Sequence, residues 1–190
     1  MNARRIRALL AALLWLAACP AALAQTLNGR DLFTLEIPKE WQDYGIDTGL
    51  DVEGQYYDLG FAGGPGARDL NVSLSLYAYP EYAGLRLFDA DERQIQDFTA
   101  MIMQEYDGSK FMSVRRVSQY DIPFSVFLCK DGQAQYICAA TLANGWAIVI
   151  SGAAYADGKY DAMRALNGDD IAQFMEILDS FEPVLKGNER

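Results

Sequence analysis

Histidine is absent from the 190 residues of this chain. Its absence excludes Ser–His–Asp triads, histidine general bases and metal sites that require imidazole ligands. Basic residues are also scarce: 16 Lys and Arg stand against 26 Asp and Glu, for a formal net charge of −10. So acidic a chain is a poor partner for nucleic acid or for an anionic membrane surface. With 51% hydrophobic and 22% charged residues, the composition is that of a folded globular protein.

The chain has one apolar run of note, and it lies within residues 1–24. Three arginines precede an apolar stretch over 8–18, which is too short to span a bilayer. Ala22 and Ala24 then supply the small residues of a cleavage site, with Gln25 as the new N-terminus. This three-part pattern predicts a secretory signal peptide. Its removal would take away three arginines and no acid, so the mature protein would be more acidic still.

A second processing site overlaps the first. Leu16-Ala-Ala-Cys19 resembles a bacterial lipobox, in which Cys19 is lipidated and becomes the first residue. Both alternatives predict export, to the periplasm or the medium in one case and to a membrane-anchored lipoprotein in the other. No second apolar stretch is long enough to cross a bilayer. Residues 25–190 have a length typical of one domain.

Periodicity predicts the elements of this domain. Alternating apolar residues indicate strands, and apolar residues at helical spacing indicate helices. Asp89 or Asp91 is expected to cap the first helix. Strands are expected over 31–37, 51–59, 70–79, 111–120, 123–130, 133–142 and 146–155, helices over 90–106 and 169–181, and a glycine-rich loop over 60–66.

Two dipeptides, Asp131-Gly132 and Asn144-Gly145, are typical of two-residue hairpin turns. The second turn sets Leu142 opposite Ala147 and makes both faces of the hairpin apolar. A sheet that is apolar on both faces must be covered on both. We therefore expect an α+β fold, a mainly antiparallel sheet with a helix on each face. The predicted rows are Cys138, Ala140, Leu142, Ala147 and Val149 on one face, and Ile137, Ala139, Thr141, Ile148 and Ile150 on the other.

Two short motifs carry a resemblance to a known group. Phe33-Thr-Leu-Glu-Ile-Pro38, followed by Trp41, resembles the F-x-x-x-x-P-x-x-W opening of PsbP-like proteins, and Ile177-Leu-Asp-Ser-Phe181 is similar to the end of their last helix. The group includes Ran-binding Mog proteins, photosystem II PsbP and bacterial periplasmic DcrB-like proteins. The resemblance implies an α/β/α sandwich and a role that is usually non-enzymatic, accessory or binding. It transfers no functional residue, and the glycine-rich stretch over 60–66 is not typical of it.

Cys19 is either removed with the signal peptide or becomes the lipid anchor. Cys129 and Cys138 then remain as the cysteines of the folded domain. In an oxidising compartment such a pair favours a disulfide. A tight turn at Asp131-Gly132 argues against the bond, because it separates the two sulfurs by four residues along the sheet, about 13 Å at ~3.3 Å per residue. Either both thiols are buried and free, or the turn is wider and they bond. A catalytic thiol is disfavoured, since no histidine is present to activate it.

The acids and glycines offer weaker candidates. Asp157, Asp161, Asp169 and Asp170 lie close in sequence, but no EF-hand pattern is present, and we read them as loop and helix-start charges. The glycine-rich stretch over 60–66 lacks the Lys and Ser/Thr of a phosphate-binding loop and is read as a flexible loop. We expect no metal and no cofactor.

A tyrosine-rich surface is the candidate for binding. Tyr77, Tyr79 and Tyr82 lie on the outward face or at the end of one predicted strand, near Arg86. Tyrosine suits interfaces because it combines a rigid ring with a polar tip. The alternative is that a helix covers this face. The isolated pair Arg115-Arg116 is read as an ion-pair element.

The sequence therefore predicts an exported, non-enzymatic binding or accessory protein of the bacterial cell envelope, with an unidentified protein or envelope component as its partner. The alternative is a periplasmic hydrolase that uses carboxylates or a metal, which needs two or more acids converging in one pocket.

Overall fold

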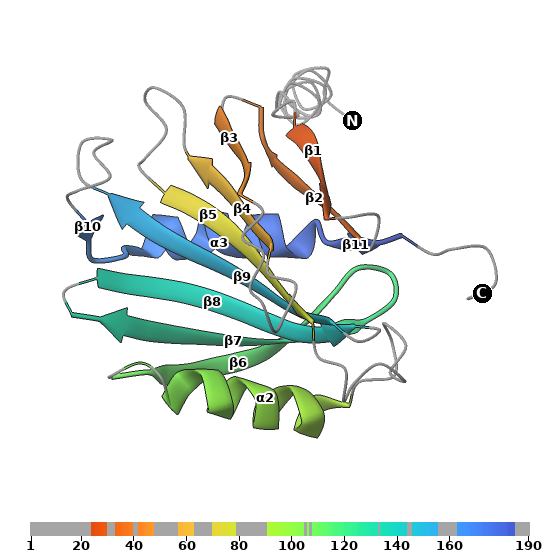
Figure 1. Ribbon diagram of the computed structural model, residues 1–190, viewed down its shortest axis with the longest axis vertical. Helices are drawn as coiled ribbons and strands as arrows, with labels where there is room; N and C mark the ends of the chain where they lie inside the picture. The colour runs from red at the N-terminus through yellow and green to blue at the C-terminus, as the bar shows by residue number, and fades with distance from the viewer. Residues whose placement is uncertain are drawn as a thin grey trace, which may run out of the picture.

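The structure is a computed structural model. Within the described residues, the strands form two antiparallel sheets and two helices pack against the larger sheet (Figure 1). The structure describes residues 24–29, 33–39, 42–47, 57–62, 70–78, 91–104, 106, 108–132, 134–143, 146–155 and 163–184.

The larger sheet is antiparallel throughout its described length. The two-residue β10 (Met163–Arg164) adds to the end of one of its central strands. In spatial order the other strands are β3 (Gln42–Asp47), β4 (Tyr57–Ala62), β5 (Leu70–Ala78), β9 (Trp146–Tyr155), β8 (Ala134–Ala143), β7 (Ile122–Asp131) and β6 (Lys110–Val117).

The smaller sheet joins the two ends of the described chain. Its order is β1 (Ala24–Gly29), β2 (Phe33–Pro38) and β11 (Glu182–Pro183). The predicted alternation of β2 is confirmed, because Phe33, Leu35 and Ile37 are all buried. The pairing of β1 with β2, and the return of the C-terminal segment to β2, were not predicted.

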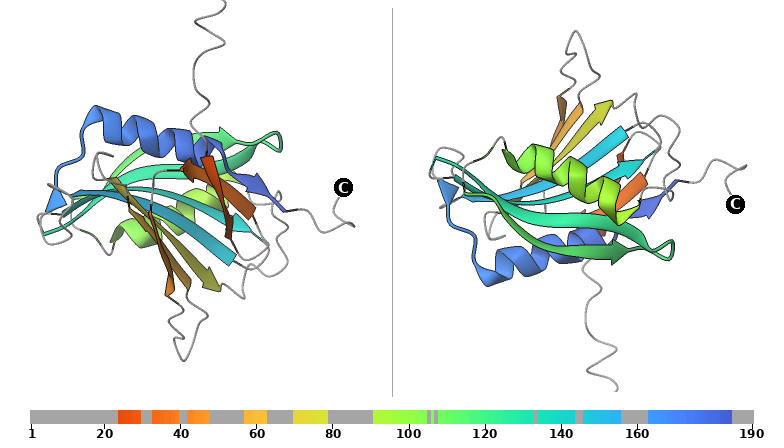
Figure 2. Two further views of the ribbon diagram at one scale, coloured as in Figure 1. Left: turned by 90° about the horizontal axis from the view of Figure 1, so that it is seen from above. Right: turned by 90° about the horizontal axis from the view of Figure 1, so that it is seen from below.

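The helices α2 (Glu92–Gln104) and α3 (Gly168–Asp179) lie on opposite sides of the larger sheet, as Figure 2 shows. The fold class predicted from the two apolar rows is therefore confirmed. We call the two sides of the sheet the α2 face and the α3 face. The α2 face holds a cluster of buried residues made of Ile95, Phe98, Phe127, Cys129, Cys138, Ala140, Leu142, Ala147 and Val149.

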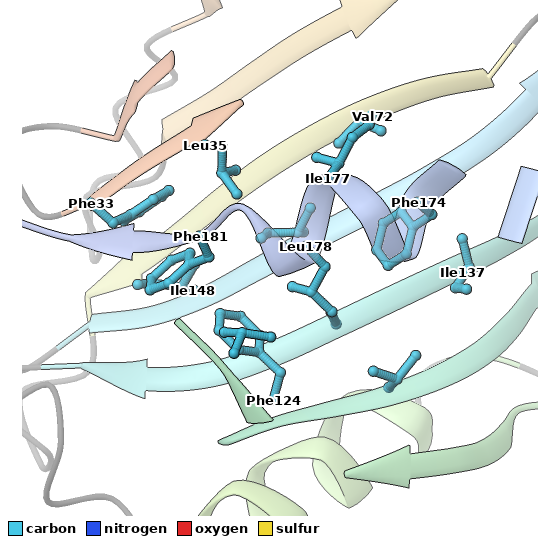
Figure 3. Packing of buried hydrophobic residues seen from close by; sticks show 14 of the residues in the cluster. Phe33, Leu35, Val72, Phe124, Ile137, Ile148, Phe174, Ile177, Leu178 and Phe181 are labelled. Carbon is cyan, nitrogen blue, oxygen red and sulfur yellow. The ribbon is translucent and has the colours of Figure 1, made fainter. Parts of the chain in front are cut away.

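The α3 face holds the larger cluster, which Figure 3 shows from close by. Here α3 and β2 together cover the sheet. Phe181 stacks on Phe33 with ring centroids 4.8 Å apart and meets Phe124 edge-on at 5.0 Å. The Ser180 hydroxyl accepts the backbone N–H of Glu36 at 2.8 Å. The two motifs that carry the PsbP-like resemblance therefore contact each other and have a structural role.

Sequence patterns also placed the helix starts. Asp91 caps α2, as one of the two predicted acids, and forms a reciprocal pair with Gln94: each side chain accepts the backbone N–H of the other. Asn167 caps α3 in the same way with Asp170. These pairs satisfy N–H groups that the first turn of a helix leaves without partners.

Part of the predicted glycine-rich loop is a strand. Gly60, Phe61 and Ala62 belong to β4 and pair with Ser73, Val72 and Asn71 of β5. The predicted strand over 51–59 overlaps β4 only at its end. The pairing with β5 explains the shift, because a strong neighbouring strand imposes extended structure even on glycine. The rest of the predicted loop lies outside the described residues.

Candidate functional site

The two cysteines lie side by side on the α2 face. Cys129 is 2% exposed on β7 and Cys138 is 6% exposed on β8, and their Sγ atoms are 3.5 Å apart. No disulfide bond joins the two cysteines in the structure. Cys129 stands opposite Tyr136 and Cys138 opposite Phe127, so the two cysteines are diagonal neighbours across the strand pair.

This arrangement corrects the predicted register. The prediction paired Lys130 with Gln133, whereas Lys130 pairs with Gln135 and Asp131 with Ala134. The turn is therefore centred one residue later, with Gly132 supplying a positive φ of 59°. A turn displaced by one residue shifts the pairing by two, and this shift brings together sulfurs that were expected to lie about 13 Å apart.

The environment favours the protonated form of the Cys138 thiol. The pKa of Cys138 is raised well above its ordinary value, first by the hydrogen bond with Cys129 and then by burial. A protonated, buried thiol is a weak nucleophile. The pair therefore does not have the chemistry of a catalytic cysteine, although it has the proximity of a redox pair.

Ser125 lies on the same strand and in the same row as Cys129. Its side chain is fully buried, and its Oγ has no hydrogen-bond partner among the described residues. Thr141, on the opposite face, is equally buried but donates its hydroxyl to the carbonyl oxygen of Pro123 at 2.8 Å. A buried hydroxyl without a partner destabilises the folded state.

The predicted ion-pair role of Arg115 and Arg116 is confirmed. Arg115 makes a bidentate contact with Asp179, the last residue of α3, and Arg116 contacts Glu92, the first residue of α2, at 2.5 Å. These carboxylate contacts raise the pKa of both guanidinium groups. One strand at the edge of the described sheet is thereby tied to both helices, and Asp121 adds a second contact to Arg116.

The described acids of the predicted acidic loop are engaged at a helix start. Asp170 is 1% exposed, accepts the backbone N–H of Asn167 and forms a bidentate pair with Arg164 at 2.6 and 2.9 Å. Asp169 is exposed in the first turn of α3. Asp157 and Asp161 lie outside the described residues. Within the described part of the chain, no three His, Cys, Asp or Glu residues are grouped to hold a metal ion.

The structure gives little of the predicted tyrosine surface. The backbone of Tyr77 belongs to β5, opposite Ala147 of β9. Tyr79, Tyr82 and Arg86 lie outside the described residues, and so do Cys19 and the predicted signal peptide up to residue 23. These assignments stay predictions. No helix within the described ranges has the length and apolar character needed to cross a membrane.

The edge strand β6 carries exposed apolar residues that the sequence analysis missed. Phe111 is 44% exposed and Met112 is 38% exposed. The ladder with β7 is irregular between Phe111 and Ser113, which leaves Met112 as an extra residue on the edge. The signal in the sequence was the adjacent pair Phe111-Met112, which breaks the alternation of a half-buried strand.

The fold has a counterpart among solved structures. The solution structure of cyanobacterial PsbP (CyanoP) from Synechocystis sp. PCC 6803 matches 87% of this chain and 95% of its own, with a TM-score of 0.50 and 16% sequence identity. The chain has the PsbP fold. At this identity the similarity establishes the fold alone. No profile of a known protein family matches the sequence, and no curated protein is significantly similar to it.

Proposed function

We propose that the chain is an exported, non-enzymatic accessory protein of the bacterial cell envelope that binds a protein or an envelope component. The PsbP fold supports this proposal, because the PsbP-like group that the two motifs resemble has mainly accessory and binding roles. A formal net charge of −10 argues against nucleic acid as the partner.

The observation that carries the binding role is the apolar edge at β6. Phe111 and Met112 are exposed on a strand that, within the described sheet, pairs on one side only. Aromatic residues and methionine are enriched at protein interfaces, and an unpaired strand edge offers backbone N–H and C=O groups to a partner. The edge is held in place, since Arg115 and Arg116 tie it to both helices.

A second candidate stretch lies on the α2 face at β4 and β5, and the strands β9, β8 and β7 separate it from β6. The main contacts of α2 are with β7 and β8, and in Figure 1 no described helix lies in front of β4 and β5. Position 77 on β5 lies in this stretch, opposite Ala147. For this reason we include the predicted tyrosine surface around Tyr77, Tyr79, Tyr82 and Arg86 as a second proposed binding surface.

Export is the other half of the proposal. A cut after Ala24 would remove only the first residue of β1, and Gln25 would keep its pairing with Ile37. The mature chain would therefore retain its smaller sheet. Lipidation at Cys19 would instead leave a short tether before β1 and would anchor the same domain to a membrane.

Photo-crosslinking in intact cells tests the proposal. A photoreactive phenylalanine analogue replaces Phe111 in one full-length variant and Tyr77 in a second. A third variant carries it at Glu176, which is exposed on α3. We expect a discrete adduct from position 111 or 77, in the envelope fraction, and none from position 176. Equal labelling from all three positions, or none from any, would overturn the binding role.

No described observation favours the alternative of a carboxylate-dependent hydrolase. Among the residues whose side-chain burial the structure describes, Asp170 is the buried acid, and Arg164 and Asn167 already engage it. A general acid or base needs a carboxyl that can reach a substrate proton.

A further inference from the structure

We propose that Cys129 and Cys138 are a redox pair, which closes into one cross-strand disulfide in an oxidising compartment before α2 packs over it. The pair is distinct from the proposed binding edge. It rests on the export half of the proposed function, but it requires an oxidant and no binding partner, so its failure and that of the binding role are separable.

Proximity is the first argument. The Sγ atoms are 3.5 Å apart on one face of adjacent strands, and a disulfide needs about 2.05 Å. Side-chain rotation covers part of this difference. Diagonal positions on antiparallel strands place α-carbons about 7–8 Å apart, whereas disulfides usually span about 4.4–6.8 Å. Closure must therefore draw β7 and β8 together locally, which favours a bond more reducible than an unstrained structural disulfide.

Burial is the second argument, and it fixes the order of events. Cys129 and Cys138 share a buried cluster with Ile95 and Phe98 of α2. An oxidant cannot reach the thiols of cysteine residues that are 2% and 6% exposed beneath a packed helix. The raised pKa of Cys138 further lowers the thiolate fraction in the folded chain. Oxidation is therefore expected while the hairpin of β7 and β8 has formed and α2 has not yet docked.

The chemistry balances with a disulfide oxidant, such as oxidised glutathione or the disulfide of an oxidoreductase. One cysteine thiolate attacks a sulfur of the oxidant, forms a mixed disulfide with it and expels the other sulfur of the oxidant as a thiolate. The second cysteine thiolate then attacks the sulfur of the first cysteine and expels the remaining half of the oxidant as a second thiolate. The protein loses two protons and two electrons, and the oxidant is reduced to two thiols.

The direct test uses the full-length chain with Cys19→Ala, which removes the third thiol. The protein is isolated from expressing cells under denaturing alkylation, and its intact mass and peptide map are measured. We expect a chain two hydrogens lighter, without alkyl groups, with Cys129 and Cys138 in one linked peptide pair. Two alkylated cysteines, intermolecular dimers or separate glutathione adducts would overturn the redox pair.

A second measurement tests the order of events. Oxidised glutathione is added either to the folded, reduced protein or during its refolding from denaturant. We expect closure during refolding to be faster than in the folded protein by more than about tenfold. Similar rates in the two conditions would contradict the role of α2 as a cover.

Matched variants separate local opening from global unfolding. Phe98→Leu loosens the cluster over the thiols, and Phe174→Leu loosens the α3 face, where Phe174 is fully buried. We expect Phe98→Leu to speed oxidation of the folded protein more than Phe174→Leu does at similar stability. Equal acceleration by both would mean that oxidation proceeds through global unfolding and would overturn the cover.

Discussion

Gly152 of β9 leaves room for α3. A Cβ added there would lie 2.8 Å from Cδ2 of Phe174 and 3.1 Å from Cγ2 of Ile137, closer than packed carbon atoms approach. Because Gly152 pairs with Ile137, this close approach lies on the α3 face of the sheet. Glycine at this position is required by packing, since the surrounding aromatic and branched side chains are buried and fill the space.

Gly152→Ala is therefore expected to lower the free energy of unfolding by about 1–3 kcal/mol through overpacking. Gly168→Ala, at the first position of α3, is the matched control, because a Cβ there meets nothing within 4 Å. It should be neutral or slightly stabilising. Urea unfolding of both variants checks the pair, and equal effects would contradict the close packing of α3 on β9.

Ser125 and Thr141 give a second matched pair of buried residues. Ser125→Ala removes a buried hydroxyl that has no partner among the described residues, and it should raise the free energy of unfolding by up to about 1 kcal/mol. Thr141→Val removes the hydrogen bond to the Pro123 carbonyl and should lower it by about 1 kcal/mol. Urea titrations of the two variants measure these changes in the free energy of unfolding. A Ser125→Ala variant less stable than the wild-type protein would show that this hydroxyl has a partner.

The raised pKa of Cys138 predicts that the stability of the reduced protein depends on pH. The thiol ionises near pH 8.5 in the unfolded chain, and its pKa is raised well above that in the folded protein. Between these two values the folded state holds the extra proton. Its contribution to stability is therefore full at lower pH and declines as pH rises above about 8.5, by at most about 1.4 kcal/mol per pH unit.

The measurement is urea unfolding with reductant from about pH 8 to about pH 9.5. Reduced wild-type protein should lose more stability over this range than Cys138→Ala. Parallel pH profiles would count against the raised pKa.

At the scale of elements, the start of α3 is the most strongly tied helix end. Asn167 and Asp170 cap each other's backbone N–H groups, and Asp170 also pairs with Arg164. Asp170→Ala should lower the free energy of unfolding by about 2 kcal/mol, because it removes a cap and leaves a partly buried guanidinium without its carboxylate. The exposed neighbour Asp169→Ala should cost about 0.5 kcal/mol through the helix dipole.

Thermal or urea unfolding of the two variants compares the adjacent acids directly. Similar losses would mean that the charge of the first turn matters more than the cap. A loss confined to Asp170→Ala would support the described hydrogen bonds.

The hairpins show how far the sequence predicts strand pairing. Asn144-Gly145 gave the correct register, with Leu142 opposite Ala147. Asp131-Gly132 gave a register wrong by two, because Asp131 ends β7 and Gly132 begins the turn. A dipeptide of this kind marks a turn but leaves open which residue takes the positive φ. The proximity of the two cysteines depended on that single choice.

Other elements were beyond local patterns. β4 includes Gly60, which has little strand propensity by itself and is extended because it pairs with Ser73. β11 consists of two residues, and its pairing with β2 depends on where α3 ends. The exposed edge at Phe111 and Met112 could not be identified before β6 was placed at the end of the sheet. Long-range pairing decides all three, and it has no local signature.

At the scale of the whole molecule, the described sheet is covered on the α3 face and over part of the α2 face, and its edge at β6 carries exposed apolar residues. The α3 face is closed by α3 and the smaller sheet, and α2 covers the β7 and β8 part of the other face. Phe111 and Met112 are exposed on β6, at the end of the described sheet. The proposed binding role agrees with this arrangement, because three of the four buried polar residues described, Thr99, Thr141 and Asp170, already have hydrogen-bond partners within the fold.

The location and processing of the mature chain test the account most directly, because export underlies both the accessory role and the redox pair. Osmotic-shock fractionation identifies the compartment of the chain, and intact-mass measurement with N-terminal peptide mapping identifies its first residue. The account predicts a chain that begins at Gln25 in the periplasmic fraction, or a lipidated chain that begins at Cys19 in the membrane fraction. An unprocessed chain that begins at Met1 and stays in the cytoplasm would contradict it.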